Sequence, residues 1–168
     1  MKEFADRRAD LANLAPGTRL ACSLFLAFSL ASYAVMVLLA VEKSGLTPDS
    51  VATYWLGGGE QYGKTKAELL ETTHFHLFSM PMFLFVQGHV FLMSRWPQRW
   101  KRALVVAAFV GAALDLASPW LVLELGPALA WCKIAARALL APTLLVFAIV
   151  PLHEMWFARR DGRDASGA

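Results

Sequence analysis

The sequence predicts an all-α, polytopic membrane protein built as a bundle of four transmembrane helices. Its composition is the first indication. Hydrophobic residues make up 57% of the 168 residues and charged residues only 17%, whereas soluble domains carry about 45–50% apolar and about 25% charged residues. The second indication is four apolar stretches, each long enough to cross a bilayer core, which needs roughly 20 residues in a helix. We therefore expect a single membrane domain over residues 1–168.

The apolar stretches place the spans at about residues 20–41, 70–94, 103–123 and 128–157. Lipid offers no hydrogen-bond partner to unpaired backbone groups, so each stretch is expected to be helical. A signal-peptide core is usually about 7–15 residues long. The first stretch is longer than that, and we expect it to remain in the protein as an anchor.

The longest polar connection, residues 42–69, is expected to form an outer loop. Within it, the segment Thr47-Pro48-Asp49-Ser50 predicts the start of a helix, capped by Thr47 or Ser50. Three glycines follow at residues 57–59. They lack the Lys-Ser/Thr pair of a phosphate-binding loop, so a nucleotide site is not predicted.

Lys and Arg residues are distributed unequally between the two sides of the predicted bundle. One side has eleven: Lys2, Arg7, Arg8, Arg19, Arg95, Arg99, Lys101, Arg102, Arg159, Arg160 and Arg163. The other side has three: Lys43, Lys64 and Lys66. Basic loops stay in the cytoplasm, so both termini are predicted to be cytoplasmic, in a bacterial-type inner membrane. These residues flank spans and form no aromatic-interleaved patch, so no nucleic-acid partner is expected.

Three of the four histidines, His74, His76 and His89, lie in the second span. Ionisable residues inside a membrane usually mark a site or a partner. At about 100° per residue, one helix face carries Glu71, His74, Phe78, Met82, Phe85, His89 and Met93. His76 and Met80 are predicted to point roughly the other way.

His89 and His153 are predicted to lie at the same depth. Each precedes a basic residue by six positions, Arg95 and Arg159 respectively, or by about 9 Å of helix. Two imidazoles at one depth on different helices are suited to ligate a haem iron from both sides. This geometry predicts a b-type haem near the cytoplasmic face.

The bundle with His89 and His153 resembles the four-helix membrane cytochromes b, in which paired histidines hold haem between helices. The resemblance implies haem b, with His74 or His76 as an outer ligand. Two-haem members of that class space histidines on one helix about fourteen positions apart, whereas here the intervals to His89 are 13 and 15. The segment Thr73-His74-Phe75-His76-Leu77-Phe78 also resembles uncharacterised bacterial four-span membrane proteins, which implies no function.

Two other interpretations use the same residues. Imidazole and thioether ligands suit copper(I), and His74, His76, Met80 and Met82 form such a string, although its successive pairs lie on opposite faces of one helix. Over both the haem and the copper interpretation, the metal-ligand candidates are His89, His153, His74 and Met82. Alternatively, the histidines only connect helices of an assembly or scaffold subunit, since polar side chains hold membrane helices together.

The third and fourth spans contain Asp115 and Arg137. An isolated charge at that depth is expected to pair, which predicts an Asp115–Arg137 pair. The alternative is a proton or quinone site formed by Glu71, Asp115 and Arg137. The leading prediction is a small b-type haem subunit for electron transfer or anchoring. It would be linked to a quinol pool and to other membrane or periplasmic redox subunits, and would be a subunit rather than a stand-alone enzyme.

Overall fold

A computed structural model describes residues 10–59 and 61–158 of the chain. Four of its helices are long and apolar enough to cross a membrane, which confirms the predicted all-α membrane fold. They are α1 (Pro16–Ser44), α3 (Lys66–Leu92), α4 (Gln98–Leu125) and α5 (Ala130–Phe157). Basic residues 2, 7, 8, 159, 160 and 163, used above for orientation, lie outside the described residues.

The connection between α1 and α3 contains a further helix and two short strands. Helix α2 (Pro48–Leu56) begins where the sequence predicted, because Thr47 and Ser50 form a reciprocal capping box. The two-residue strands β1 (Gly57–Gly58) and β2 (Gln61–Tyr62) then pair antiparallel. Short 3-10 turns, η2 (Leu11–Asn13) and η3 (Pro127–Leu129), precede α1 and α5.

Helices α1 and α4 extend beyond both ends of the apolar stretches that predicted them, whereas α3 ends two residues before residue 94 and α5 begins two residues after residue 128. The start of α3 is four residues earlier than expected because Thr65 and Glu68 form a second capping box. Proline lies inside three of the spans, at positions 81, 119, 142 and 151, and the helices continue through it. Neighbouring helices and local adjustments make this tolerable in a membrane protein.

Helices α3, α4 and α5 pack around the main core. Small residues on α4 allow close approach: a Cβ added at Gly111 would lie 2.9 Å from Leu140 Cγ of α5. Phe91 of α3 stacks on Phe147 of α5 with ring centroids 4.9 Å apart. The buried members of this core are Leu84, Phe91, Ala108, Ala112, Leu140 and Phe147.

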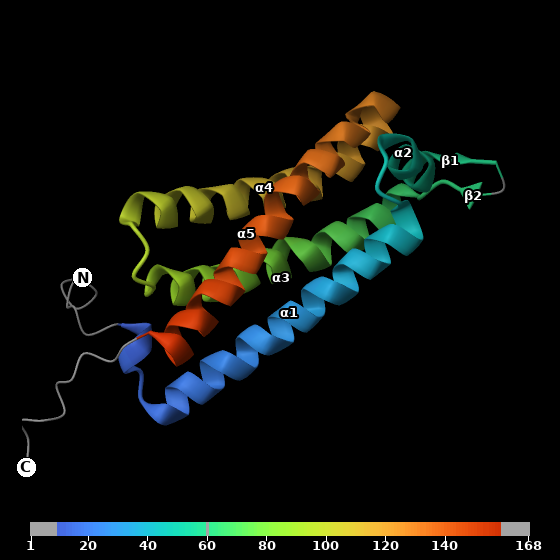
Figure 1. Ribbon diagram of the computed structural model, residues 1–168. Helices are drawn as coiled ribbons and strands as arrows, with labels where there is room; N and C mark the ends of the chain where they lie inside the picture. Colours follow the sequence, from blue (N-terminus) through green and yellow to red (C-terminus); the bar gives the residue numbers. More distant parts are fainter. Residues whose placement is uncertain (1–9, 60, 159–168) are drawn as a thin grey trace, which may run out of the picture.

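Helix α1 lies at the edge of the bundle, along α5 and α3 (Figure 1). Its buried Leu26 packs with Ala148 and Met155 of α5. Toward α3 it presents aromatic rings: Phe25 and Tyr33 lie edge-on to Phe83, at 5.8 and 6.0 Å between centroids. The Tyr33 hydroxyl also donates to Gln87 Oε1 of α3. Only 17% of the most apolar segment of α1 is buried inside the protein, so most of the surface of this helix faces outward.

Candidate functional site

The ionisable residues of the spans form two groups, one inside the bundle and one on its outer surface. The inside group begins with Asp115 of α4. Its carboxylate pairs with Lys133 of α5 at 2.8 Å, and the two side chains are only 21% and 13% exposed. Lys133 Nζ also donates to the Asp115 carbonyl at 3.1 Å. The predicted Asp115–Arg137 pair is therefore wrong: the partner is the lysine one turn earlier on α5.

Arg137 bonds instead to the end of α1. Its guanidinium donates to Gly45 O at 2.8 Å and to Ser44 Oγ at 2.6 Å. The last carbonyls of a helix lack intrahelical partners and carry partial negative charge. The guanidinium of Arg137 therefore stabilises the end of α1. Lys133, and not Arg137, forms the ion pair with Asp115.

The third candidate of the proton or quinone site, Glu71, is exposed on α3. Within residues 10–59 and 61–158, no hydrogen bond or ion pair joins it to Asp115 or Arg137. The structure does not bring these three residues together. It adds a contact that the sequence did not indicate, between Trp120 Nε1 of α4 and Thr73 Oγ1 of α3 at 2.9 Å.

A second set of interior polar residues holds the connection between α3 and α4. Glu154 of α5 accepts the Arg95 backbone N–H, at 2.8 Å to Oε2 and 3.1 Å to Oε1. Lys101 Nζ donates to Leu92 O at 2.7 Å and to Ser94 O at 2.8 Å, where α3 ends. Glu154 and Lys101 are each only 8% exposed. Lys101 binds two free carbonyls at the end of α3, and Glu154 binds a free amide in the turn that follows. We therefore assign both residues a structural role.

The outside group includes the histidine face that the sequence predicted. Six residues of α3 that share one side of the helix are all exposed, and we call them the α3 outer face: Glu71, His74, Phe78, Met82, Phe85 and His89. The opposite side of α3 carries Leu84, Gln87, Gly88 and Phe91, which are buried. The predicted register is therefore present, and it points away from the bundle core.

The remaining two histidines differ in their surroundings. His76 is half-buried, and its Nδ1 lies 2.8 Å from Thr72 O, a hydrogen-bond distance when Nδ1 carries the proton. His153 is exposed on α5, with its ring 5.4 Å from that of Phe157. On α3, the ring of His89 lies 5.8 Å from that of Phe85. His89 and His153 thus both lie on outer surfaces, each beside a phenyl ring of its own helix.

No group of three or more His, Cys, Asp or Glu able to hold a metal ion occurs in the part of the chain that the structure describes. A bis-histidine haem needs only two protein ligands, so that finding does not test it. In this arrangement, however, His89 and His153 do not enclose a slot inside the bundle. A haem between them would lie at the protein surface, and it stays a prediction.

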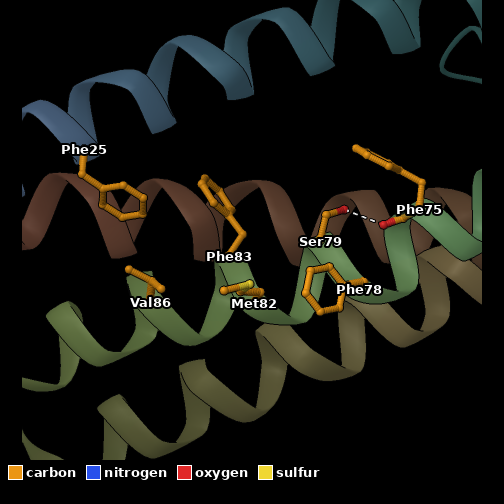
Figure 2. A pocket seen from close by; sticks show the side chains of 7 residues that line it. All are labelled: Phe25, Phe75, Phe78, Ser79, Met82, Phe83 and Val86. Carbon is orange, nitrogen blue, oxygen red and sulfur yellow. Dashed lines mark hydrogen bonds between the residues drawn. The ribbon is translucent and has the colours of Figure 1, made fainter.

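Met82, a metal-ligand candidate from the sequence, lines an apolar groove between α1 and α3. Figure 2 shows Phe25 of α1 and Phe83 of α3 pointing into the gap between these helices, with Met82, Val86, Phe78, Ser79 and Phe75 along α3. The groove encloses about 450 Å³. Its lining is almost entirely apolar: the Ser79 hydroxyl donates to Phe75 O of its own helix, at 2.9 Å.

Comparison with known proteins agrees with this fold. Residues 45–162 match Aq_1264_TM, a family described as a transmembrane helical domain. The chain belongs to the Aq_1264_TM family. No curated protein and no solved structure matches it. The family match shows a membrane protein and does not show a cytochrome b.

The family match begins at Gly45, the residue that directly follows α1. The Aq_1264_TM domain thus contains α2 to α5, the Asp115–Lys133 pair, the α3 outer face and all four histidines. Helix α1, the span least buried in the protein, lies outside it. Arg137 therefore joins the family domain to the end of the additional span.

Proposed function

We propose that this protein is a non-catalytic anchor or assembly subunit of a larger membrane complex, and that it meets its partner through the α3 outer face. The observation that supports this proposal is the division of the ionisable residues into two groups. Inside the bundle, charges satisfy one another. On α3, ionisable residues near both ends of one outward face flank a row of exposed aromatic and Met side chains.

The interior contacts argue against catalysis within the bundle. Asp115 and Lys133 pair with each other, Arg137 binds the end of α1, and Glu154 binds a backbone amide. Each of these groups has a structural use. A general acid or base needs a substrate position within hydrogen-bond reach, and these contacts occupy the groups that would provide it.

The outer face argues for a protein partner. Ionisable residues within membrane spans almost always face the interior of a bundle or another polar group. Phe78 and Phe85 are 74% and 64% exposed, between His74 and His89 on the same face. Aromatic residues are enriched at protein interfaces, and imidazoles hydrogen-bond across packed membrane helices. A helix of a partner would cover the two phenyl rings and offer a hydrogen-bond partner to His74.

Site-specific cross-linking tests the proposal. A benzophenone amino acid at Phe78 should yield one discrete adduct with another membrane protein in native membranes. The matched control is Phe28 of α1, which is 76% exposed but lies outside the family domain. It should yield only lipid adducts. The proposal fails if neither position gives a protein adduct, if both give the same one, or if Phe78 joins only to a second copy of this chain.

A second candidate function is b-type haem electron transfer linked to a quinol pool. The exposed imidazoles of His89 and His153 favour it, since each could supply one axial ligand from an outer surface. Held by these two imidazoles, a haem would supply one-electron transfer. The purified complex should then show a Soret band. His89→Ala or His153→Ala should remove it, and His76→Ala should retain it. A colourless complex that gains no band with haemin would reject haem.

A further inference from the structure

The connection between α3 and α4 and the first turns of α4 carry four basic residues, Arg95, Arg99, Lys101 and Arg102, and the structure divides them into two pairs. Arg95 Nη2 forms a salt bridge with Asp10, at 2.5 Å. Lys101 is buried and donates to two carbonyls at the end of α3. These two residues bind other parts of the protein itself.

Arg99 and Arg102 form no comparable salt bridge within the described part of the chain. Both are exposed, and neither forms a salt bridge with any residue in the described ranges 10–59 and 61–158. They are three positions apart on α4, so their side chains emerge on the same side of the helix. Two adjacent guanidinium groups without a counter-charge make a strongly positive patch.

A hollow of about 340 Å³ lies at this patch, lined by Arg99, Trp100 and Ala103. The Arg99 guanidinium carbon lies 5.8 Å from the centre of the Trp100 ring. Ala103, one turn after Arg99, leaves the hollow open because its side chain is small. The Trp100 side chain is 53% exposed. Tryptophan is enriched where lipid headgroups meet acyl chains, so the hollow lies at headgroup depth beside the end of α3.

We infer that Arg99, Trp100 and Arg102 bind the phosphate headgroup of an anionic phospholipid in the leaflet that borders the α3–α4 connection. Guanidinium groups bind phosphate through paired, charge-assisted hydrogen bonds. The indole supports the glycerol region, and Ala103 leaves room for the headgroup. The charges of the patch and of the lipid are complementary. This site does not depend on the proposed partner of the α3 outer face.

Native mass spectrometry of the detergent-solubilised protein, titrated with phosphatidylglycerol or phosphatidylcholine, tests this inference. The wild type should hold one phosphatidylglycerol in clear preference to phosphatidylcholine. Each arginine near an anionic membrane surface contributes about fivefold to affinity. The double variant Arg99→Gln/Arg102→Gln should therefore bind phosphatidylglycerol roughly 25-fold more weakly, while its melting temperature stays unchanged because both side chains are exposed.

Three further arms separate the explanations. Ala103→Leu fills the hollow without changing charge and should also weaken binding. Lys43→Gln removes an exposed cation at the other end of the bundle, where α1 ends, and should leave binding unchanged. Inorganic phosphate should not displace the lipid at equal concentration. Equal binding of the two lipids, an unaffected double variant, an equal loss in Lys43→Gln or displacement by inorganic phosphate would each overturn the inference.

Discussion

Removing the carboxylate of Asp115 is the most informative perturbation of the bundle interior. In Asp115→Ala, the Lys133 ammonium stays in a site where its side chain is only 13% exposed. Breaking a buried ion pair from one side costs about 3–5 kcal/mol. Lys133 keeps its bond to the Asp115 backbone carbonyl, so we expect the lower end of that range, about 3 kcal/mol.

A double-mutant cycle with Lys133→Met measures the pair itself. The double variant Asp115→Ala/Lys133→Met leaves no unpaired charge and should recover most of the loss, because replacing both ions by apolar groups is often neutral. Reversible unfolding in detergent, followed by helical circular dichroism, gives the free energies. The control cycle pairs Asp115→Ala with Arg137→Met, and its coupling energy should be clearly smaller.

Two outcomes would refute this reasoning. Additive losses in the Asp115–Lys133 cycle would show that the two side chains do not stabilise one another. A larger coupling with Arg137 than with Lys133 would restore the pair that the sequence alone suggested. Either result would mean that the contact between Asp115 of α4 and Lys133 of α5 is wrongly assigned.

Two further predictions concern other contacts, and a third concerns the orientation of the protein in the membrane. Gly111→Ala should destabilise the bundle by about 1–3 kcal/mol through overpacking, because its Cβ would meet Leu140. The control is Gly88→Ala, which should be tolerated because the nearest side-chain atom is 3.6 Å away. Equal melting temperatures of the two variants would contradict the close approach of α4 to α5. Partial burial raises the pKa of Asp10, but hydrogen bonds from Arg95 and the Ala12 amide outweigh it and hold the pKa below its ordinary value of 3.8. The Asp10 carboxylate therefore stabilises the fold above that pH, and the advantage of wild type over Asp10→Asn in melting temperature should disappear as the pH falls further; a constant advantage would exclude the Asp10–Arg95 bond as its source. The third prediction concerns orientation and uses the Cys22→Ala/Cys132→Ala variant, which has no other cysteine. A cysteine introduced at Gly58 should be labelled from outside intact cells, whereas one introduced at Gly162, beyond the described residues, should be labelled only after permeabilisation. Labelling at position 162 from outside would reject the predicted orientation.

Much of the architecture was predictable because membrane spans follow from local properties of the sequence. Apolar length alone located the four long helices, since a stretch of about 20 apolar residues crosses a bilayer as a helix, which pairs its own backbone groups. Thr47 marked the start of α2 through its capping geometry. The 3.6-residue period also identified which residues of α3 share a side with His74 and His89, except for Met93, which follows the end of α3 and is half-buried.

The direction of that side was decided only by the tertiary structure. In a soluble protein, the apolar side of a helix is the inner side. In a membrane, lipid and protein core are equally apolar, so hydrophobicity does not distinguish a buried side from a lipid-facing one. The α3 outer face and the buried side around Gln87 are both rich in apolar residues. Packing of Leu84 and Phe91 against α4 and α5 determines which of them points inward.

The sequence likewise could not predict which partners Lys133 and Arg137 bind. Lys133 and Arg137 are one helical turn apart on α5, and either side chain is long enough to reach a carboxylate on a neighbouring helix. The sequence by itself determined that Asp115 needs a cation. The position of the end of α1 decided which one, because its free carbonyl at Gly45 and the Ser44 hydroxyl bind Arg137 and leave Lys133 to Asp115.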